Sequence, residues 1–327
     1  METRNKEKYL SCKWLESGVC FDNGVYGSNV KVCCYLSAPG GGNTMIFKDY
    51  HGEKINWDEF FKIKREYRDI QKAGGIVSGC QGCIFLEENY WDNDDYVDSV
   101  IFDHFTRCNC NCSYCYTDED KKMYNKLKTY NVYPIVEDML KRGILKTGGA
   151  IGFGGGEPTI LPEFEKLISL LLKKGFTNIR VPSSGIKYSK IIEKGISTGQ
   201  LTVVVSIDSS SRETYKAIKK IDAYNKVTKN IIKYAKAQQF GSYNVTSKYI
   251  IIPKVNDTQE ELENWLYFNK KNNIELLVLD IENSWLSKYR EDKPDEKILD
   301  LMRYVETKAK EMEFFRFELC DRAKYLL

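Results

Sequence analysis

The sequence predicts an α/β fold in which six consecutive βα units form a partial barrel behind a small cysteine-rich N-terminal region. One observation is the alternation, after residue 98, of apolar runs of strand length with amphipathic helical patterns, which is typical of a parallel sheet covered by helices. The other is the position of the cysteines, because ten of the eleven lie between Cys12 and Cys115. Such clustering indicates metal binding in the first third of the chain.

Six units between residues 98 and 320 match the density of a βα barrel, whose complete eight-unit form takes about 250 residues. We therefore expect a partial (β/α)6 TIM-like barrel over residues 98–320 and a separate region over residues 1–97; a doubly wound open sheet is the alternative. The expected strands cover residues 99–105, 150–153, 177–181, 201–207, 245–252 and 275–281. The expected helices cover residues 57–73, 134–142, 163–173, 188–193, 212–238, 260–270 and 295–312.

Composition and charge narrow the class of protein. The chain has 42% hydrophobic and 29% charged residues, which is ordinary for a globular enzyme. Its net charge is only +3, so we expect no nucleic acid partner. No apolar run approaches the roughly 20 residues of a membrane span, and the first residues lack the apolar core of a secretory signal, so we expect a cytoplasmic protein. Two lysine sets are expected to form solvated helix faces, namely Lys216, Lys219, Lys220 and Lys229, Lys233, Lys236.

The first expected barrel strand is followed by a loop that contains four cysteines, Cys108, Cys110, Cys112 and Cys115. The C-x3-C-x2-C subset of Cys108, Cys112 and Cys115 can face one metal centre if the loop is tight. Three cysteine thiolates bind a [4Fe–4S] cluster and leave one iron open to a non-protein ligand. A zinc loop and reduced structural cysteines are the alternatives.

This spacing, with Tyr114 before the last cysteine, resembles the signature of the radical S-adenosylmethionine (SAM) superfamily. The usual loop has no cysteine where Cys110 stands, and we interpret Cys110 as a loop cysteine. The resemblance extends over residues 97–285 and implies a [4Fe–4S] cluster on Cys108, Cys112 and Cys115, with the fourth iron left for SAM.

The second expected strand leads into a glycine turn, Gly154-Gly155-Gly156-Glu157-Pro158. Glycines allow positive φ and close approach of the backbone to a ligand, and a following proline fixes the exit of the chain. Taken alone, the segment fits an ordinary tight βα turn. Within the resemblance, Gly155, Gly156, Glu157 and Pro158 look like the family's GGEP segment, which cradles the amino group of SAM's methionine.

Three later loops follow in the same order as in the family. Ser183 stands after the third strand, where relatives often carry Thr-Asn-Gly. Ser206 and Asp208, at the fourth strand, resemble the polar pair that contacts SAM's carboxylate and ribose. Ile252 opens a segment, residues 252–257, that resembles the family's apolar-Pro-x-Val-Asn-Asp loop beside the adenine. Serine, aspartate and asparagine are also ordinary turn and cap residues, but barrel enzymes place their chemistry on the loops after the strands.

The resemblance implies reductive cleavage of SAM to methionine and a 5′-deoxyadenosyl radical, which abstracts hydrogen from a substrate. It also implies a one-electron donor such as flavodoxin or ferredoxin. We expect the substrate to be a peptide or a small molecule such as a sugar. A non-catalytic iron–sulfur electron carrier or scaffold is the alternative, which accounts for the cysteines but not for the loops at residues 155–158 and 206–208.

A second cysteine set precedes the barrel. Cys80 and Cys83 form a C-x2-C knuckle flanked by glycines, and a short strand expected over residues 30–34 delivers two further thiols. The set loosely resembles the SPASM or twitch extensions, which usually follow the barrel, and implies an auxiliary iron–sulfur cluster. The implied ligands are Cys33, with Cys34 as its competitor, Cys80, Cys83, and either Cys12 or Cys20. Zinc and a thioredoxin-like redox pair are the alternatives.

The remaining polar candidates carry no assigned role. His104 precedes the cysteine loop and is expected to be a packed core histidine rather than a site residue; His51 is the other histidine of the chain. Asp280, Glu282 and Trp285 follow or end the sixth strand, where they could face a substrate.

Overall fold

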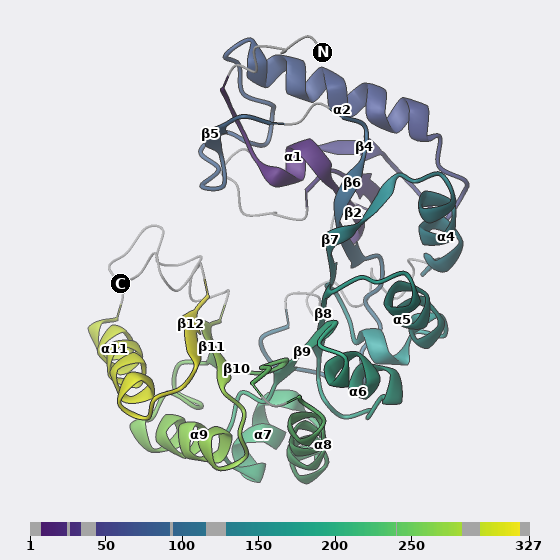
Figure 1. The fold of residues 1–327 in the computed structure, drawn as a ribbon. Helices are drawn as coiled ribbons and strands as arrows, with labels where there is room; N and C mark the ends of the chain where they lie inside the picture. Colours follow the sequence, from purple (N-terminus) through teal and green to yellow (C-terminus); the bar gives the residue numbers. More distant parts are fainter. Residues whose placement is uncertain are drawn as a thin grey trace. The chain divides into compact units, whose positions relative to one another are not determined.

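The computed structural model describes residues 8–24, 27–33, 44–91, 94–115, 129–239, 241–282 and 295–320. The chain divides into two compact units (Figure 1). The first comprises Met1–Thr106 and Met123–Gly156, and the second Arg107–Lys122 and Glu157–Leu327. The units therefore separate just before the cysteine loop and inside the glycine turn. The separate region expected over residues 1–97 stays a prediction.

The described helices and strands of the first unit are, in chain order, β1 (Tyr9–Ser11), α1 (Lys13–Ser17), β2 (Gly18–Gly24), β3 (Gly27–Lys31), β4 (Met45–Phe47), α2 (Trp57–Lys72), β5 (Glu87–Asn89), β6 (Val97–Asp103), α4 (Tyr133–Lys141) and β7 (Leu145–Phe153).

The N-terminal strands of the first unit share a sheet with the first barrel strand. β2 runs parallel to β6, with Asp22 opposite Asp103, and β6 runs parallel to β7. β3 is antiparallel to β2, and β4 is antiparallel to β3. The sequence predicted only a strand over residues 30–34 here, because Cys20 and Asp22 interrupt the apolar run that marks a buried strand.

Aromatic packing holds these strands together on one side of the sheet. The Phe21 ring stacks on the Phe102 ring with centroids 5.8 Å apart, and Phe102 contacts Phe153 at 5.3 Å. α2 begins where the sequence predicted, because the Asn56 side chain accepts a hydrogen bond from the first turn and caps the helix. Trp57, at the start of α2, is buried in the first unit.

The described elements of the second unit are, in chain order, the 3₁₀ turn η1 (Pro158–Ile160), α5 (Phe164–Lys173), β8 (Asn178–Ser183), α6 (Lys190–Ser197), β9 (Leu201–Ser206), α7 (Arg212–Lys219), α8 (Tyr224–Lys236), β10 (Val245–Ile251), α9 (Gln259–Lys271), β11 (Leu276–Ile281), α11 (Glu296–Glu311) and β12 (Arg316–Leu319).

Strands β8 to β12 run parallel to one another in sequence order. Helices α5, α6, α8, α9 and α11 lie along their outer face (Figure 1), as the crossover connections of parallel strands require. Trp265 of α9 and Met302 of α11 are buried against Tyr249 of β10 in the core of this unit. Because these five helices cover the outer face, the loops after the strands are left to form a site.

Three features of the second unit differ from the sequence prediction. The helix expected over residues 212–238 is two helices, because α7 ends at Lys219 and the next residue, Lys220, has a left-handed φ of 55°. The helix expected over residues 188–193 begins only at Lys190, after the Ser189 N-cap position. β12 is an additional parallel strand that was not predicted from the sequence. It has only four residues, and two of them are charged.

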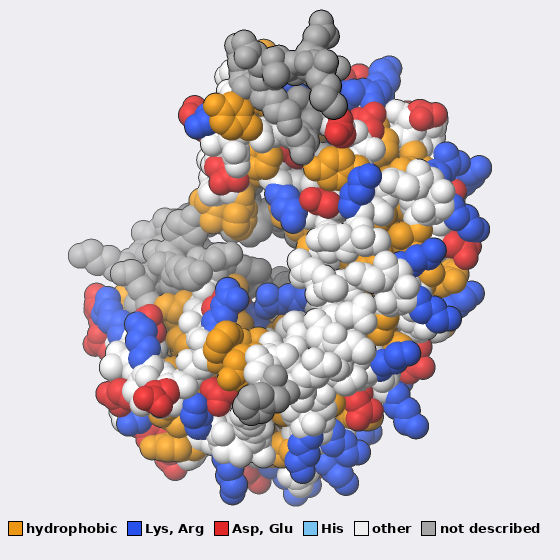
Figure 2. All heavy atoms as spheres, viewed as in Figure 1, with side chains coloured by type: hydrophobic (Ala, Val, Ile, Leu, Met, Phe, Trp, Pro, Cys, Tyr) orange, Lys and Arg blue, Asp and Glu red, His pale blue; other side chains and the backbone are white. Residues whose placement is uncertain are grey.

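The surface follows the expected charge pattern on α8 but not on α7. Lys229, Lys233 and Lys236 are exposed, and Figure 2 shows lysine and arginine side chains gathered over the outer side of α8. On α7, Lys219 is buried, contrary to expectation. Among the described helices, none has the length and apolar character needed to cross a bilayer.

Candidate active site

The cysteine loop lies against the C-terminal end of α7. The backbone N–H of Asn111 donates to the carbonyl of Lys219 at 3.1 Å, and that of Ser113 donates to the carbonyl of Ile218 at 2.9 Å. The last carbonyls of a helix lack partners within the helix, so the loop satisfies them. The helix end therefore sets the path of the loop.

The cysteines of this loop interact with one another. The backbone N–H of Cys110 donates to the Cys108 sulfur at 3.4 Å. Hydrogen bonding between the side chains lowers the pKa of Cys108 and raises the pKa of Cys110. The pKa of Cys112 falls to about 6, first because of the Cys110 hydrogen bond and then, against the effect of burial, because of the Lys219 charge. Since the thiolate is the metal ligand, Cys108 and Cys112 are suited to bind iron.

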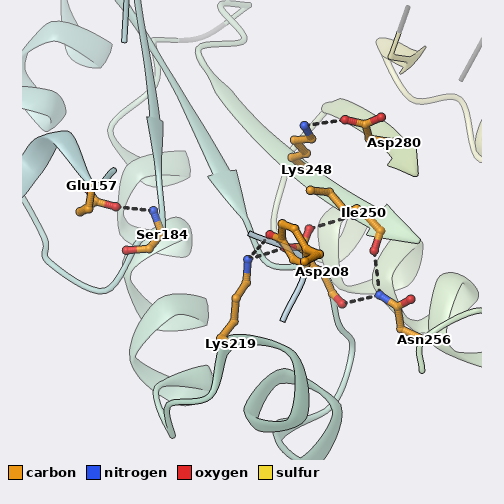
Figure 3. A network of polar contacts seen from close by, with 9 residues as sticks. Glu157, Ser184, Asp208, Lys219, Lys248, Ile250, Asn256 and Asp280 are labelled. Atoms are coloured by element: carbon orange, nitrogen blue, oxygen red, sulfur yellow. Dashed lines mark hydrogen bonds and ion pairs between the residues drawn. The ribbon is translucent and has the colours of Figure 1, made fainter. Parts of the chain in front are cut away.

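Behind the loop, Tyr114, Asp208 and Lys219 form a buried polar cluster. The Tyr114 hydroxyl donates to the Asp208 carboxylate at 2.6 Å, and the Lys219 ammonium donates to the Tyr114 hydroxyl at 2.8 Å. Lys219 and Asp208 also form an ion pair whose side chains are 2% and 0% exposed (Figure 3). Burial lowers the pKa of Lys219, but the charges of Asp208 and Cys112 outweigh it and raise that pKa to about 12.

Lys219 is the site residue that sequence reasoning missed, since we expected it on a solvated face. Lys216 and Lys220 are indeed exposed. Tyr215 and Ile218 mark the buried face of α7, and Lys219 lies next to it. The spacing of apolar residues along α7 could have indicated that Lys219 lies at the edge of the buried face. No sequence pattern could have indicated its partner, because the Asp208 carboxylate that compensates the buried charge is eleven residues away.

The Glu157 side chain contacts the loop after β8 within the second unit. Its buried carboxylate accepts hydrogen bonds from the Ser183 hydroxyl at 3.0 Å and from the Ser184 N–H at 2.6 Å. The Thr159 N–H also donates to it, at 3.2 Å. The Glu157 N–H donates to the Arg107 carbonyl at 2.9 Å. Two residues predicted for SAM binding, Glu157 and Ser183, are therefore in direct contact.

In the first unit, the glycine turn is shaped by close backbone contacts. Gly155 has a φ of 71°, and a Cβ atom there would lie 2.1 Å from the Phe105 carbonyl oxygen and 2.6 Å from Asp103 Oδ1. The Gly156 N–H donates to the same carbonyl at 3.0 Å. Burial, followed by the Asp22 charge, raises the pKa of Asp103 to about 8. Only glycine fits position 155.

Asn256 connects the loops that follow β9 and β10. Its Nδ2 donates to the carbonyls of Asp208 and Ile250, both at 2.8 Å (Figure 3). Its Oδ1 accepts from the Ile252 N–H at 2.6 Å. The structure thus brings Asp208 and Ile252 together through one amide side chain.

The neighbouring strand ends carry further polar side chains. Ser206, a predicted SAM contact, is half-buried and pairs in register with Lys248. The Lys248 ammonium forms an ion pair with the Asp280 carboxylate at 2.8 Å. Trp285 lies outside the described residues.

The fit of the loop to an iron–sulfur cluster rests on its donor chemistry. Within the described residues, no group of three or more His, Cys, Asp or Glu side chains is arranged to hold a metal ion as it stands. Cys108, Cys112 and Cys115 nevertheless supply three thiols from one short loop; Cys108 is exposed and the other two are half-buried. Two of these thiols have lowered pKa values, so the residues fit the cluster.

The N-terminal cysteines have different surroundings. Cys12 and Cys80 are buried in an apolar cluster with Leu15 and Val77. Burial raises the pKa of Cys12, and it raises the pKa of Cys80 to about 12. The charge of Cys83 contributes to both shifts, which places its thiol near the other two.

The other implied ligands lie elsewhere in the first unit. Cys20 is buried within β2, opposite Lys31 and Ile101. Cys33 is half-buried after β3. Cys34 lies outside the described residues.

His104 is a core residue, as expected. It is fully buried, and the rings of Phe102, Phe105 and Tyr130 surround it with centroids 6.2, 5.1 and 5.1 Å away. His51 is exposed.

Comparison with known proteins decides the family. The model of the radical SAM superfamily matches residues 102–266, half of the 327-residue chain. The chain belongs to the radical SAM superfamily. As a radical SAM enzyme, it uses a [4Fe–4S] cluster and SAM. The residues that bind them here remain predictions.

Curated proteins match parts of the chain in sequence. The GTP 3′,8-cyclase of Clostridium botulinum strain Hall is 27% identical over 179 residues, covering 54% of this chain and 53% of that protein. The 7,8-dihydro-6-hydroxymethylpterin dimethyltransferase of Methanocaldococcus jannaschii is 30% identical over 113 residues, covering 33% of this chain and 22% of that protein. This radical SAM chain spans about half the length of the first of these relatives.

Solved structures confirm the α/β class of the fold. Streptococcus suis SuiB bound to SAM aligns with 81% of this chain and 57% of its own, with a TM-score of 0.54 and 12% identity. SuiB bound to its precursor peptide SuiA aligns with 96% of this chain and 73% of its own, with a TM-score of 0.50 and 11% identity. At these identities the likeness concerns the fold alone.

Proposed function

We propose that this chain cleaves SAM reductively and uses the resulting 5′-deoxyadenosyl radical to abstract hydrogen from a substrate. The observation that carries the proposal is the cysteine loop, which is fixed to α7 by two backbone hydrogen bonds and has two thiols with lowered pKa values. When bound, the [4Fe–4S] cluster supplies the electron that breaks a C–S bond of SAM. A donor such as flavodoxin or ferredoxin would supply that electron in turn.

The residues of the chain have distinct roles in this proposal. Cys108, Cys112 and Cys115 hold the cluster. The Glu157 carboxylate is occupied by protein donors, so it fixes the turn and leaves the backbone of Gly155 and Gly156 to bind the amino group of SAM. Tyr114 and Pro158 fix the loop and the exit of the turn. The adenosyl and carboxylate groups of SAM are contacted by four further residues, Ser183, Ser206, Asp208 and Ile252.

The test is anaerobic reconstitution with iron and sulfide, followed by reduction with dithionite in the presence of SAM. We expect 5′-deoxyadenosine and methionine by liquid chromatography, and neither product from Cys112→Ser. A reconstituted chain with a reduced cluster that forms no 5′-deoxyadenosine would overturn the proposal and favour an electron carrier or scaffold.

We propose a peptide as the substrate class. The support is the likeness of fold to SuiB, one structure of which is bound to a precursor peptide. A nucleotide is the second candidate, because several sequence relatives are named GTP 3′,8-cyclase. GTP itself separates the two: if GTP is consumed as 5′-deoxyadenosine forms, the peptide proposal is wrong. Consumption of a short peptide encoded beside the gene, with GTP left intact, would support it.

We further propose an auxiliary iron–sulfur cluster on Cys12, Cys80 and Cys83, with Cys33 as the fourth ligand. The proximity of the first three thiols in the first unit supports this assignment. Two [4Fe–4S] clusters require about eight iron atoms per reconstituted chain. A count of about four iron atoms per chain, the same in wild type and Cys80→Ala, would contradict the second cluster. Zinc bound to the purified protein would instead support a zinc site at these cysteines.

A further inference from the structure

Lys219 is a buried cation beside the cysteine loop that the proposed steps leave unused. Its side chain is 2% exposed, whereas the neighbouring Lys216 and Lys220 are exposed on the same helix end. Burying a charge costs free energy unless it is paired and hydrogen-bonded. The position of Lys219 is thus a specific feature of this site.

The contacts of Lys219 reach the loop from two directions. Its backbone carbonyl accepts the hydrogen bond of the Asn111 N–H at 3.1 Å. Its ammonium donates to the Tyr114 hydroxyl and lies 5.1 Å from the centroid of the Tyr114 ring. One residue therefore contacts both flanks of Cys112.

The Lys219 ammonium and the Asp208 carboxylate do not form an isolated pair. The carboxylate is also hydrogen-bonded by the Tyr114 hydroxyl and the Ile250 N–H, which disperse its negative charge. The ammonium also donates to the Tyr114 hydroxyl, so the buried positive charge contacts the loop directly through Tyr114.

We propose that Lys219 is a positioning residue for the iron–sulfur loop, whose buried ammonium orders Tyr114 and makes the bound cluster easier to reduce. Reduction adds one electron, and hence one negative charge, to a cluster already held by thiolates. A fixed positive charge nearby stabilises that added charge, because cluster potentials depend on net charge, hydrogen bonding and solvent exposure. The inference rests on the proposed function only in assuming that the loop binds the cluster.

The experiment compares Lys219→Met, which keeps the length of the side chain without its charge, with Lys219→Arg, which keeps the charge. Lys216→Met is the matched control, an exposed lysine on the same helix. Each full-length protein is reconstituted anaerobically, its iron is counted, and its midpoint potential is measured by EPR-monitored titration without SAM. Circular dichroism of the apo proteins reports folding.

We expect Lys219→Met to bind iron and to lower the equilibrium constant for reduction at least tenfold, which for one electron corresponds to about 59 mV. Lys219→Arg and Lys216→Met should stay within threefold of wild type. Loss of iron from a folded Lys219→Met protein while Lys219→Arg retains iron also supports the proposal.

Two results would overturn the inference. One is a loaded Lys219→Met cluster with the wild-type potential. The other is equal failure of Lys219→Met and Lys219→Arg to fold or to bind iron, because the shape of the side chain and not its charge would then matter. The potential is measured without SAM, so this test does not depend on SAM cleavage. A wild-type cluster that does not cleave SAM would contradict the proposed function, but the effect of Lys219 on the potential could still be measured.

Discussion

In the loop after β6, hydrogen bonding and the Lys219 charge lower the pKa of Cys112 to about 6, whereas burial among apolar side chains in the first unit raises the pKa of Cys80 to about 12. Both thiols belong to C-x2-C pairs, Cys112 with Cys115 and Cys80 with Cys83. The spacing of cysteines is therefore a poor guide to their state. Their surroundings decide which thiols are ready to bind metal and which must lose a proton when metal enters.

The largest expected effect is the difference between substituting a cysteine of the loop after β6 and substituting an N-terminal cysteine. Cys112→Ala should abolish formation of 5′-deoxyadenosine, because it removes a ligand of the cluster that reduces SAM, while Cys80→Ala should spare at least part of it. Product quantification by liquid chromatography after anaerobic reconstitution measures both. Equal and complete loss in the two variants would mean that the N-terminal cysteines hold the fold or the same cluster.

Alkylation of the metal-free protein sharpens the comparison. At pH 7.5 Cys112 is mostly thiolate and Cys80 almost entirely thiol, so iodoacetamide should modify Cys112 at least about a hundredfold faster. Peptide mass spectrometry at timed intervals gives the two rates. Similar alkylation rates would contradict the difference in thiol pKa between Cys112 and Cys80.

The Glu157 carboxylate tests whether the barrel loops are ordered without metal. Glu157→Gln keeps the shape of the side chain but weakens four hydrogen bonds to a buried acceptor, and should lower the free energy of unfolding of the apo protein by about 1–3 kcal/mol. Urea denaturation measures the change, and Glu165→Gln, on the exposed side of α5, is the control. No loss would mean that these loops become ordered only with the cluster.

The smallest effect concerns Lys64, a fully buried lysine of α2 close to Cys12. Burial, followed by the Arg68 charge, lowers its pKa to about 7, against about 10.4 in the unfolded chain. Between these values the unfolded chain binds more protons, so Lys64 makes stability rise with pH. Lys64→Met should remove up to about 1 kcal/mol per pH unit of that rise, measured by urea denaturation at pH 7, 8 and 9. If the free energy of unfolding changes with pH in the same way in both proteins, Lys64 is charged in the folded protein and its pKa is not lowered.

Much of the fold followed from sequence, and the reasons for the exceptions are local. The strands β9 to β11 are apolar runs bounded by turns, which periodicity identifies. β2 escaped prediction because Asp22 and Cys20 lie on a sheet face that is buried although polar. β12 escaped because its alternation of charged and apolar residues extends over only four positions, which is too short to identify a strand.

The candidate site divides in the same way. Gly155 was predictable because only glycine tolerates its φ of 71° so close to the Phe105 carbonyl. Lys219 was not, because its burial depends on a partner, Asp208, that only the folded chain brings near. Asn256 could be placed in a loop by resemblance, but its three hydrogen bonds are tertiary contacts without a sequence pattern.

The docking of the cysteine loop on the end of α7 also links iron occupancy to backbone motion. The amide protons of Asn111 and Ser113 are donated to the carbonyls of Lys219 and Ile218, so the loop can exchange these protons with solvent only when it leaves the helix. A ligand that binds only the closed form stabilises that form in proportion to its affinity. Hydrogen exchange at two amides would therefore report how tightly the chain retains its iron, with no reaction taking place.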